Sequence, residues 1–137
     1  MTAAAEMIRS YPADLGGVDR DALVRCIEAC MSCAQACTAC ADACLSEPED
    51  QLPKLRKCIR SDEDCADICN TTARILSRHT GYDVTITRSV LQACVTVCRS
   101  CGDECDSHAS RHEHCRICAE ACRRCEQTCQ ELINTLG

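Results

Sequence analysis

The residues with the clearest chemical potential are cysteines, which recur through the chain at intervals of three and four residues. In the stretch CIEACMSCAQACTACADAC, from Cys26 to Cys44, six cysteines are separated by four, three, four, three and four positions. Thiols can form disulfides, ligate soft metals or carry redox chemistry. Alternating intervals of three and four place such groups on one face of a helix.

Cysteine occupies one helical face in four separate segments. The first contains Cys26, Cys30, Cys33, Cys37, Cys40 and Cys44. The second contains Cys58, Cys65 and Cys69, with Asp62 at the missing position of the same register. The third contains Cys94, Cys98, Cys101 and Cys105. The fourth contains Cys115, Cys118, Cys122, Cys125 and Cys129. Each segment predicts one long amphipathic helix.

Helix-breaking residues separate these segments. Pro48 and Pro53 interrupt the pattern after the first segment, and Ser46 is a candidate start for the second helix. Gly81 is a candidate left-handed terminator for that helix, which we expect over roughly residues 50–79.

The fourth helix has its own start signal, because Ser110 precedes Glu113 by three residues, as in a capping box. Short connections between long helices favour antiparallel neighbours. The sequence therefore predicts an all-α, up-down-up-down four-helix bundle with a cysteine-lined core over residues 19–137. Residues 1–18 are expected to form an appendage, with a short helix around Ala3–Arg9 that lies across the bundle or serves contacts between chains.

The composition requires cysteine to fill much of the interior. A chain of 137 residues fits one domain, but this one has no Phe, no Trp, two Tyr and 18 Cys.

The N-terminus lacks the pattern of a secretory signal, and no apolar run approaches the roughly 20 residues of a transmembrane helix. We therefore expect a cytoplasmic protein with reduced thiols. The net charge of −6, without a basic cluster, argues against nucleic acid or a membrane surface as partner.

An antiparallel bundle would give its two ends different chemistry. One end would collect Cys40, Cys44, Cys58, Cys105 and Cys115 together with His108, His112 and His114. The other would collect Leu23, Ile75, Leu76, Val90, Leu91, Leu132 and Leu136. His108 follows Cys105 by three residues and His114 precedes Cys118 by four, so these two are the favoured histidine ligands and His112 is a further candidate. His79 is expected to be a solvated or capping residue at the other end.

Three familiar kinds of cysteine chemistry fit this pattern poorly. Disulfides within a helix would be strained, because i and i+4 residues have Cβ atoms about 5–6 Å apart and a disulfide needs about 3.8 Å, whereas disulfides across the bundle stay open as an alternative. Zinc or iron–sulfur sites use a few C-x-x-C pairs and leave continuous runs of cysteine unexplained. Thioredoxin-like redox chemistry uses a single pair beside a βαβ pattern.

Cu(I) fits the spacing better, because it prefers thiolate ligands and accepts two of them. The chain contains eight C-x-x-x-C pairs, which are Cys26/Cys30, Cys33/Cys37, Cys40/Cys44, Cys65/Cys69, Cys94/Cys98, Cys101/Cys105, Cys118/Cys122 and Cys125/Cys129. Buried thiolates need compensating charge, and a monovalent ion for each sulfur would leave the core neutral. We expect a capacity on the order of the cysteine count, with protons released as metal binds. Protonated cysteines can pack as small hydrophobes in the metal-free core.

The stretches CIEACMSCAQACTACADAC and HEHCRICAEACRRCEQTC resemble the bacterial copper storage proteins, and the resemblance extends over about Asp19 to Leu136. Because it lacks an export signal, the chain is most similar to the cytosolic branch of that family. The resemblance implies a four-helix bundle, often a homotetramer, that holds many Cu(I) ions through the paired cysteines. It also implies a copper entrance near His108, His112 and His114. Asp62 departs from the cysteine pattern and either faces a water-filled mouth or binds incoming metal.

The sequence thus favours a copper store without catalytic turnover, for which a copper chaperone or a small-molecule thiol would be donor or acceptor. A thiol/disulfide redox protein and a zinc- or cadmium-binding metallothionein analogue are the alternatives.

Overall fold

The computed structural model describes residues 1–137, which form helices and turns without a strand. A short helix, α1 (Ala3–Arg9), precedes four long helices. The long helices are α2 (Arg20–Leu45), α3 (Leu52–Leu76), α4 (Val84–Asp106) and α5 (Glu113–Thr135), with a 3-10 turn η1 (Glu49–Gln51) before α3. No helix combines the length and hydropathy that crossing a membrane requires.

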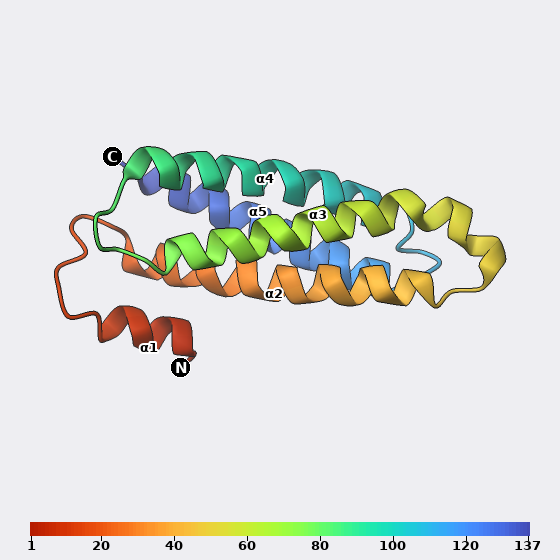
Figure 1. Ribbon diagram of the computed structural model, residues 1–137, viewed down its shortest axis with the longest axis horizontal. Helices are drawn as coiled ribbons and strands as arrows, with labels where there is room; N and C mark the ends of the chain where they lie inside the picture. The colour runs from red at the N-terminus through yellow and green to blue at the C-terminus, as the bar shows by residue number, and fades with distance from the viewer.

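The four long helices run alternately up and down around one core (Figure 1). Both α2 and α4 pack against α3 and α5, so α2 faces α4 and α3 faces α5 across the core. This arrangement confirms the predicted all-α, up-down-up-down four-helix bundle.

Aspartates start two of these helices. The Asp19 carboxylate accepts a hydrogen bond from the Ala22 N–H at 3.0 Å, and the Asp83 carboxylate accepts one from the Thr85 N–H at 2.9 Å. Each satisfies a backbone donor that has no partner within the helix. These N-cap aspartates therefore fix the residues at which α2 and α4 begin.

Two predicted boundaries around α3 are wrong. Ser46 ends α2, because its N–H donates to the Ala43 carbonyl, and α3 begins only at Leu52, with Pro53 in its first turn. Gly81 does have a positive φ of 66°, but α3 ends earlier, at Leu76. The helix stops there with Ser77 as the C-cap.

The predicted capping box of the fourth helix is also wrong. His112 is the N-cap of α5, and Ser110 lies in a turn where the N–H groups of Arg111 and His112 both donate to the His108 carbonyl. The Glu113 carboxylate accepts a hydrogen bond from Arg116 Nε at 2.7 Å instead of reaching back to a serine.

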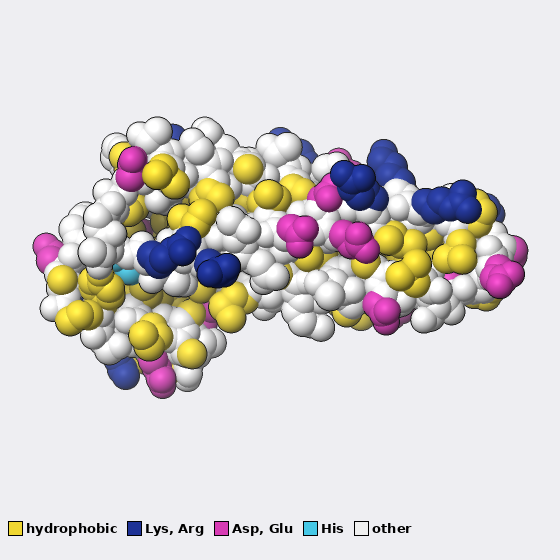
Figure 2. Space-filling model, viewed as in Figure 1, with side chains coloured by type: hydrophobic (Ala, Val, Ile, Leu, Met, Phe, Trp, Pro, Cys, Tyr) yellow, Lys and Arg dark blue, Asp and Glu magenta, His cyan; other side chains and the backbone are white.

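The core has cysteine along its length and leucine at one end. All 18 cysteines are buried, as are Leu23, Leu76, Leu91 and Leu132. Leu23, Ile75, Leu76, Leu132 and Leu136 line one cavity of about 260 Å³ at this apolar end. Figure 2 shows hydrophobic side chains around a hollow at this end, whereas Lys and Arg side chains gather over the far end.

Helix α1 lies beside α2 in Figure 1. Ile8 is buried, and Thr2 hydrogen bonds to Glu28 of α2. Tyr11 continues the contact with the apolar end, since its hydroxyl lies 3.1 Å from Thr80 Oγ1 in the α3–α4 connection. The short predicted helix around Ala3–Arg9 is thus confirmed, and it covers part of one bundle helix.

Candidate metal centre

The side chains of the 18 cysteines meet inside the bundle in a continuous stretch of sulfur, which we call the thiol column. Every cysteine in it is a free thiol. Neighbouring Sγ atoms are separated by 3.5 Å in the pair Cys26/Cys129 and by 4.0 Å in the pair Cys94/Cys98. These separations are far longer than the bond of a disulfide, about 2.05 Å.

Contacts between helices are as short as contacts within one helix. Cys37 of α2 and Cys118 of α5 have Sγ atoms 3.5 Å apart, and Cys69 of α3 and Cys98 of α4 have Sγ atoms 3.6 Å apart. Among the C-x-x-x-C pairs, sulfurs are in contact in Cys33/Cys37, Cys65/Cys69, Cys94/Cys98 and Cys101/Cys105. The column therefore offers an ion sulfurs from different helices as readily as the two sulfurs of one pair.

The thiols also gather into groups of a size that suits metal ions. Four ligand atoms lie within 4.8 Å of one another in several such groups. Examples are Cys30, Cys94, Cys125 and Cys129; Cys33, Cys65, Cys69 and Cys98; and Cys37, Cys101, Cys118 and Cys122. With a metal–sulfur bond of about 2.3 Å, two sulfurs roughly 3.8 Å apart subtend an angle of about 110° at the ion. A further group of Cys33, Cys37, Cys65 and Cys122 shares residues with two of these, so neighbouring ions could share sulfurs.

Asp62 places a carboxyl group among the thiols near the histidine end of the column. Its side chain is fully buried, and its Oδ1 accepts hydrogen bonds from the thiols of Cys101 at 3.1 Å, Cys105 at 3.3 Å and Cys118 at 3.3 Å. Burial raises the pKa of this carboxyl to about 8, and the charge of nearby Cys118 adds to the effect. Asp62 therefore lies among the thiols as a buried carboxyl that holds its proton near neutral pH. The alternative that it faces a water-filled mouth is wrong.

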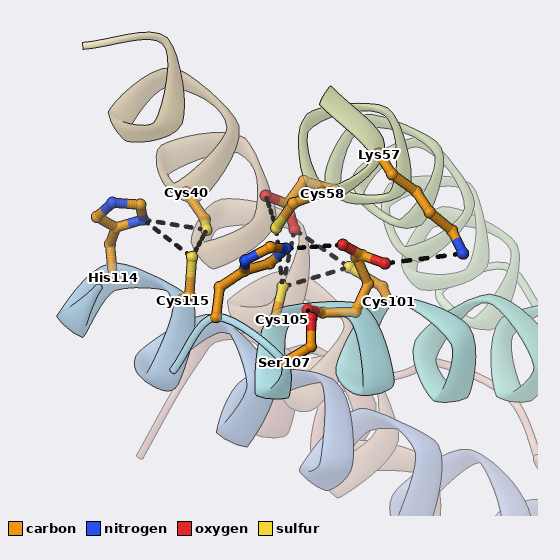
Figure 3. Close-up of polar contacts among 11 residues, drawn as sticks. Cys40, Lys57, Cys58, Cys101, Cys105, Ser107, His114 and Cys115 are labelled. Atoms are coloured by element: carbon orange, nitrogen blue, oxygen red, sulfur yellow. Dashed lines mark hydrogen bonds and ion pairs between the residues drawn. The ribbon is translucent and has the colours of Figure 1, made fainter. Parts of the chain in front are cut away.

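His114 marks the point where the column reaches the surface (Figure 3). Its Nδ1 lies 3.3 Å from Cys40 Sγ and 3.6 Å from Cys115 Sγ. Together with Cys44, these residues form a group of four ligand atoms within 4.8 Å, in which only the histidine is partly exposed. The imidazole can thus contact solvent and thiols at once.

Each of the three histidines at this end has a carboxylate partner. The His114 Nε2 donates to Glu47 Oε2 at 2.8 Å, and His112 Nδ1 lies 3.0 Å from the same oxygen. His108 Nε2 donates to Glu104 Oε2 at 2.8 Å. The hydrogen bond from His114 holds the pKa of Glu47 below its ordinary value. Glu47 is therefore an anion that accepts a hydrogen bond from the imidazole N–H of His114.

Hydrogen bonds between thiols shift their pKa values in opposite directions. The pKa of Cys58 is lowered, because Cys105 and Cys115 stabilise its thiolate. The pKa of Cys37 is raised by its neighbours Cys101 and Cys118 and by burial. A thiolate in the column is therefore stabilised by the neighbouring thiols that hydrogen bond to it.

The structure brings every predicted ligand into the thiol column or to its histidine end. In the column are Cys26, Cys30, Cys33, Cys37, Cys40, Cys44, Cys58, Cys65, Cys69, Cys94, Cys98, Cys101, Cys105, Cys115, Cys118, Cys122, Cys125, Cys129 and Asp62. At its end are His108, His112 and His114, with side chains 17, 10 and 25 % exposed. Their role as copper ligands stays a prediction.

Two carboxylates at the histidine end, Glu104 and Glu47, are not among the residues predicted from the sequence. Glu104 precedes His108 by four positions on one helical face, a spacing that predicts contact. Glu47 has no such signal, because it reaches His114 from the connection between α2 and α3, 67 positions away in the chain.

His79, at the apolar end, is not the solvated or capping residue that was expected. Its Nε2 is buried without a hydrogen-bond partner, and its ring lies edge-on to Tyr11 with ring centroids 5.1 Å apart. Burial lowers the pKa of this imidazole. It belongs to the cavity at the apolar end and not to the thiol column.

Comparison with known families gives one match that covers most of the chain. Residues 19–134 match the model of the family described as copper storage protein. The cysteine-rich protein YhjQ of Bacillus subtilis (strain 168) is 36 % identical over 96 residues, which are 70 % of this chain and 82 % of YhjQ.

Comparison with solved structures gives relatives of nearly the same length. The copper storage protein Ccsp from Streptomyces lividans, loaded with 10 copper equivalents, is 68 % identical, with a TM-score of 0.94 over 97 % of this chain and 99 % of Ccsp. A structure of a cytosolic copper storage protein from S. lividans with five coppers is 70 % identical. Its TM-score is 0.85 over 89 % of this chain and 100 % of that protein.

Proposed function

Because the chain belongs to the copper storage protein family, we propose that its thiol column stores Cu(I) at a capacity on the order of one ion per cysteine. The observation that carries this proposal is the column itself, in which 18 buried free thiols face one another along the bundle. Soft thiolates select Cu(I) over harder ions. One monovalent ion per thiolate also compensates the charge that the buried sulfurs acquire.

Copper enters at the histidine end and moves inward by exchange between neighbouring ligands. His114 is the first link, since its Nδ1 lies within 3.6 Å of two thiols while its side chain stays 25 % exposed. His108 and His112 assist capture at the same end. Asp62 and the 18 cysteines then hold the metal, with Sγ separations of 3.5–4.0 Å permitting transfer from one sulfur to the next.

The protein acts in the cytosol as a store that limits copper toxicity, as the description of the S. lividans relative as cytosolic supports. It binds and releases copper without catalytic turnover. A copper chaperone or a small-molecule thiol supplies and removes the metal. Residues 19–137 form the storage bundle and residues 1–18 an appendage, and the assembly is a homotetramer, in keeping with the resemblance to the family.

Titration of the reduced protein with Cu(I) without oxygen, followed by mass spectrometry of the intact complex, tests this proposal. We expect loading toward about one ion per cysteine with unchanged helix content. A protein that remained empty when offered Cu(I) would contradict it.

The same titration separates the two alternatives. A metallothionein analogue would saturate near one divalent ion for three or four sulfurs. A thiol/disulfide redox protein would show a mass already lowered by lost hydrogens before copper is added, and its thiols would not become protected by Cu(I).

A further inference from the structure

We propose that Glu47 is a positioning residue for copper uptake, which fixes the tautomer of His114 so that the lone pair of this imidazole faces the thiol column. This inference rests on the proposed uptake at the histidine end and adds a residue outside the predicted ligands. It concerns the rate at which copper reaches the thiols, whereas the capacity depends on the column.

The tautomer of His114 follows from what its two nitrogens contact. Nε2 lies 2.8 Å from Glu47 Oε2, and a carboxylate anion can only accept a hydrogen bond. Nε2 therefore carries the proton in the neutral ring. Nδ1 is then the lone-pair nitrogen, and it lies 3.3 Å from Cys40 Sγ and 3.6 Å from Cys115 Sγ.

His112 lies beside the same oxygen of Glu47. Its Nδ1 is 3.0 Å from Glu47 Oε2, and the rings of His112 and His114 have centroids 5.5 Å apart with a tilt of 30°. One carboxylate thus contacts two neighbouring imidazoles, and the hydrogen bond from His114 defines which nitrogen of that ring is available to a metal.

The backbone holds Glu47 in place for this role. Its N–H donates to the Cys44 carbonyl at 3.2 Å, immediately after the end of α2. Pro48 follows, and a residue before proline is restricted to extended backbone conformations. The carboxylate is 25 % exposed, so solvent competes with the imidazoles only in part. Mutation of a carboxylate that orients a ligating histidine in this way commonly lowers metal affinity or activity by 10–100-fold.

The test compares Glu47→Gln with Glu49→Gln. A glutamine at position 47 can donate as well as accept, so it no longer forces the proton onto the facing nitrogen. Glu49 is exposed, lies in the same connection and makes no ion pair, so its change removes the same charge without touching a histidine. A merely electrostatic attraction of cations would slow both variants equally.

Two measurements address the mechanism separately. Long-range ¹H–¹⁵N NMR of the metal-free protein with labelled histidine should show a lone-pair Nδ1 for His114 in the unchanged chain and in Glu49→Gln. In Glu47→Gln the His114 signals should shift toward a mixture of tautomers, with assignment from a His114→Ala sample. Stopped-flow transfer from a coloured Cu(I)–chelator complex should then show an initial uptake about tenfold slower in Glu47→Gln only.

The final capacity distinguishes failure of this inference from failure of the storage proposal. Glu47→Gln should reach the same number of bound ions as the unchanged chain. The inference is overturned if Glu47→Gln keeps both the tautomer and the uptake rate, or if it slows uptake equally in a His112→Ala, His114→Ala background. An unchanged chain that binds no Cu(I) would instead overturn the storage proposal.

Discussion

Asp62 Oδ1 lies 3.3 Å from Cys118 Sγ, and this contact joins α3 to α5, two helices that face each other across the core. Cys69 and Cys125 form a second such diagonal contact, with Sγ atoms 3.9 Å apart. The core is therefore narrow enough for one ion to be shared by opposite helices as well as by neighbours.

The stability of the metal-free protein should depend on pH through Asp62. Its pKa is about 8 in the folded chain against 3.8 without the fold, so between these values the folded state holds a proton that the unfolded state has lost. The Asp62 contribution to the free energy of unfolding should thus fall as pH rises, by about 1.4 kcal/mol per pH unit. Urea unfolding at pH 5, 6 and 7 should show this slope in the unchanged chain and not in Asp62→Asn.

Asp64→Asn is the matched control for that experiment, because Asp64 lies on the same helix but is exposed and pairs with Arg60. It should keep the slope of the unchanged chain. Equal slopes in Asp62→Asn and Asp64→Asn would show that Asp62 is not protonated in the fold.

Removing two thiols from the middle of the column should lower capacity and preserve the fold. Cys33 and Cys37 lie 3.8 Å apart and each contacts Cys122. The double change Cys33→Ala, Cys37→Ala should reduce the bound copper by about two ions and cost about 1 kcal/mol of stability per site, as small cavities do. Intact-complex mass spectrometry and circular dichroism measure the two effects. Exposed Ser32, changed to Ala, is the control, and equal capacities would contradict the prediction.

Copper binding should release protons in proportion to the thiolates formed. Thiol neighbours and burial raise the pKa of residues such as Cys37, so these thiols are protonated near neutral pH before metal arrives. A pH-stat titration should record about one proton released per Cu(I) over the main part of loading. Chelation of the copper should reverse this uptake and leave the helix content unchanged. Loading without proton release would mean that the column is already ionised.

The apolar end should contribute stability without affecting uptake. Leu132 is buried, and Leu132→Ala should lower the free energy of unfolding by about 2–5 kcal/mol. The rate of Cu(I) uptake should not change, because the histidine end keeps its contacts. Ile86→Ala, at a residue 57 % exposed, should change neither quantity measurably. Slower uptake by Leu132→Ala would place part of the copper route at the apolar end.

The cysteine spacing was sufficient to predict most of the fold and which residues lie together in the core. Intervals of three and four residues require a helical face, and a chain with few other large apolar residues can bury only that face. Antiparallel helices then bring His114 beside Cys40, as observed.

The details of the connections could not be predicted in the same way. Ser46 and Ser110 are good capping residues by type, but the backbone donates within continuing turns at both places. Glu47 reaches His114 only because η1 and Pro48 direct the connection, and such a path depends on the packed bundle. The environment of Asp62 likewise depends on thiols from two other helices, α4 and α5, so the sequence predicted its place in the register but not its burial.

The leucines at one end of the core have a consequence for the order in which stored copper is released. Under the proposed entry at the histidine end, the ion that arrives last lies nearest the way out, and the ion that arrived first lies deepest. Copper should therefore leave in the reverse order of its arrival. A protein filled first with one copper isotope and then with another should release the second isotope first. The copper bound last would therefore be the first available to the cell, and the copper bound first would be retained longest.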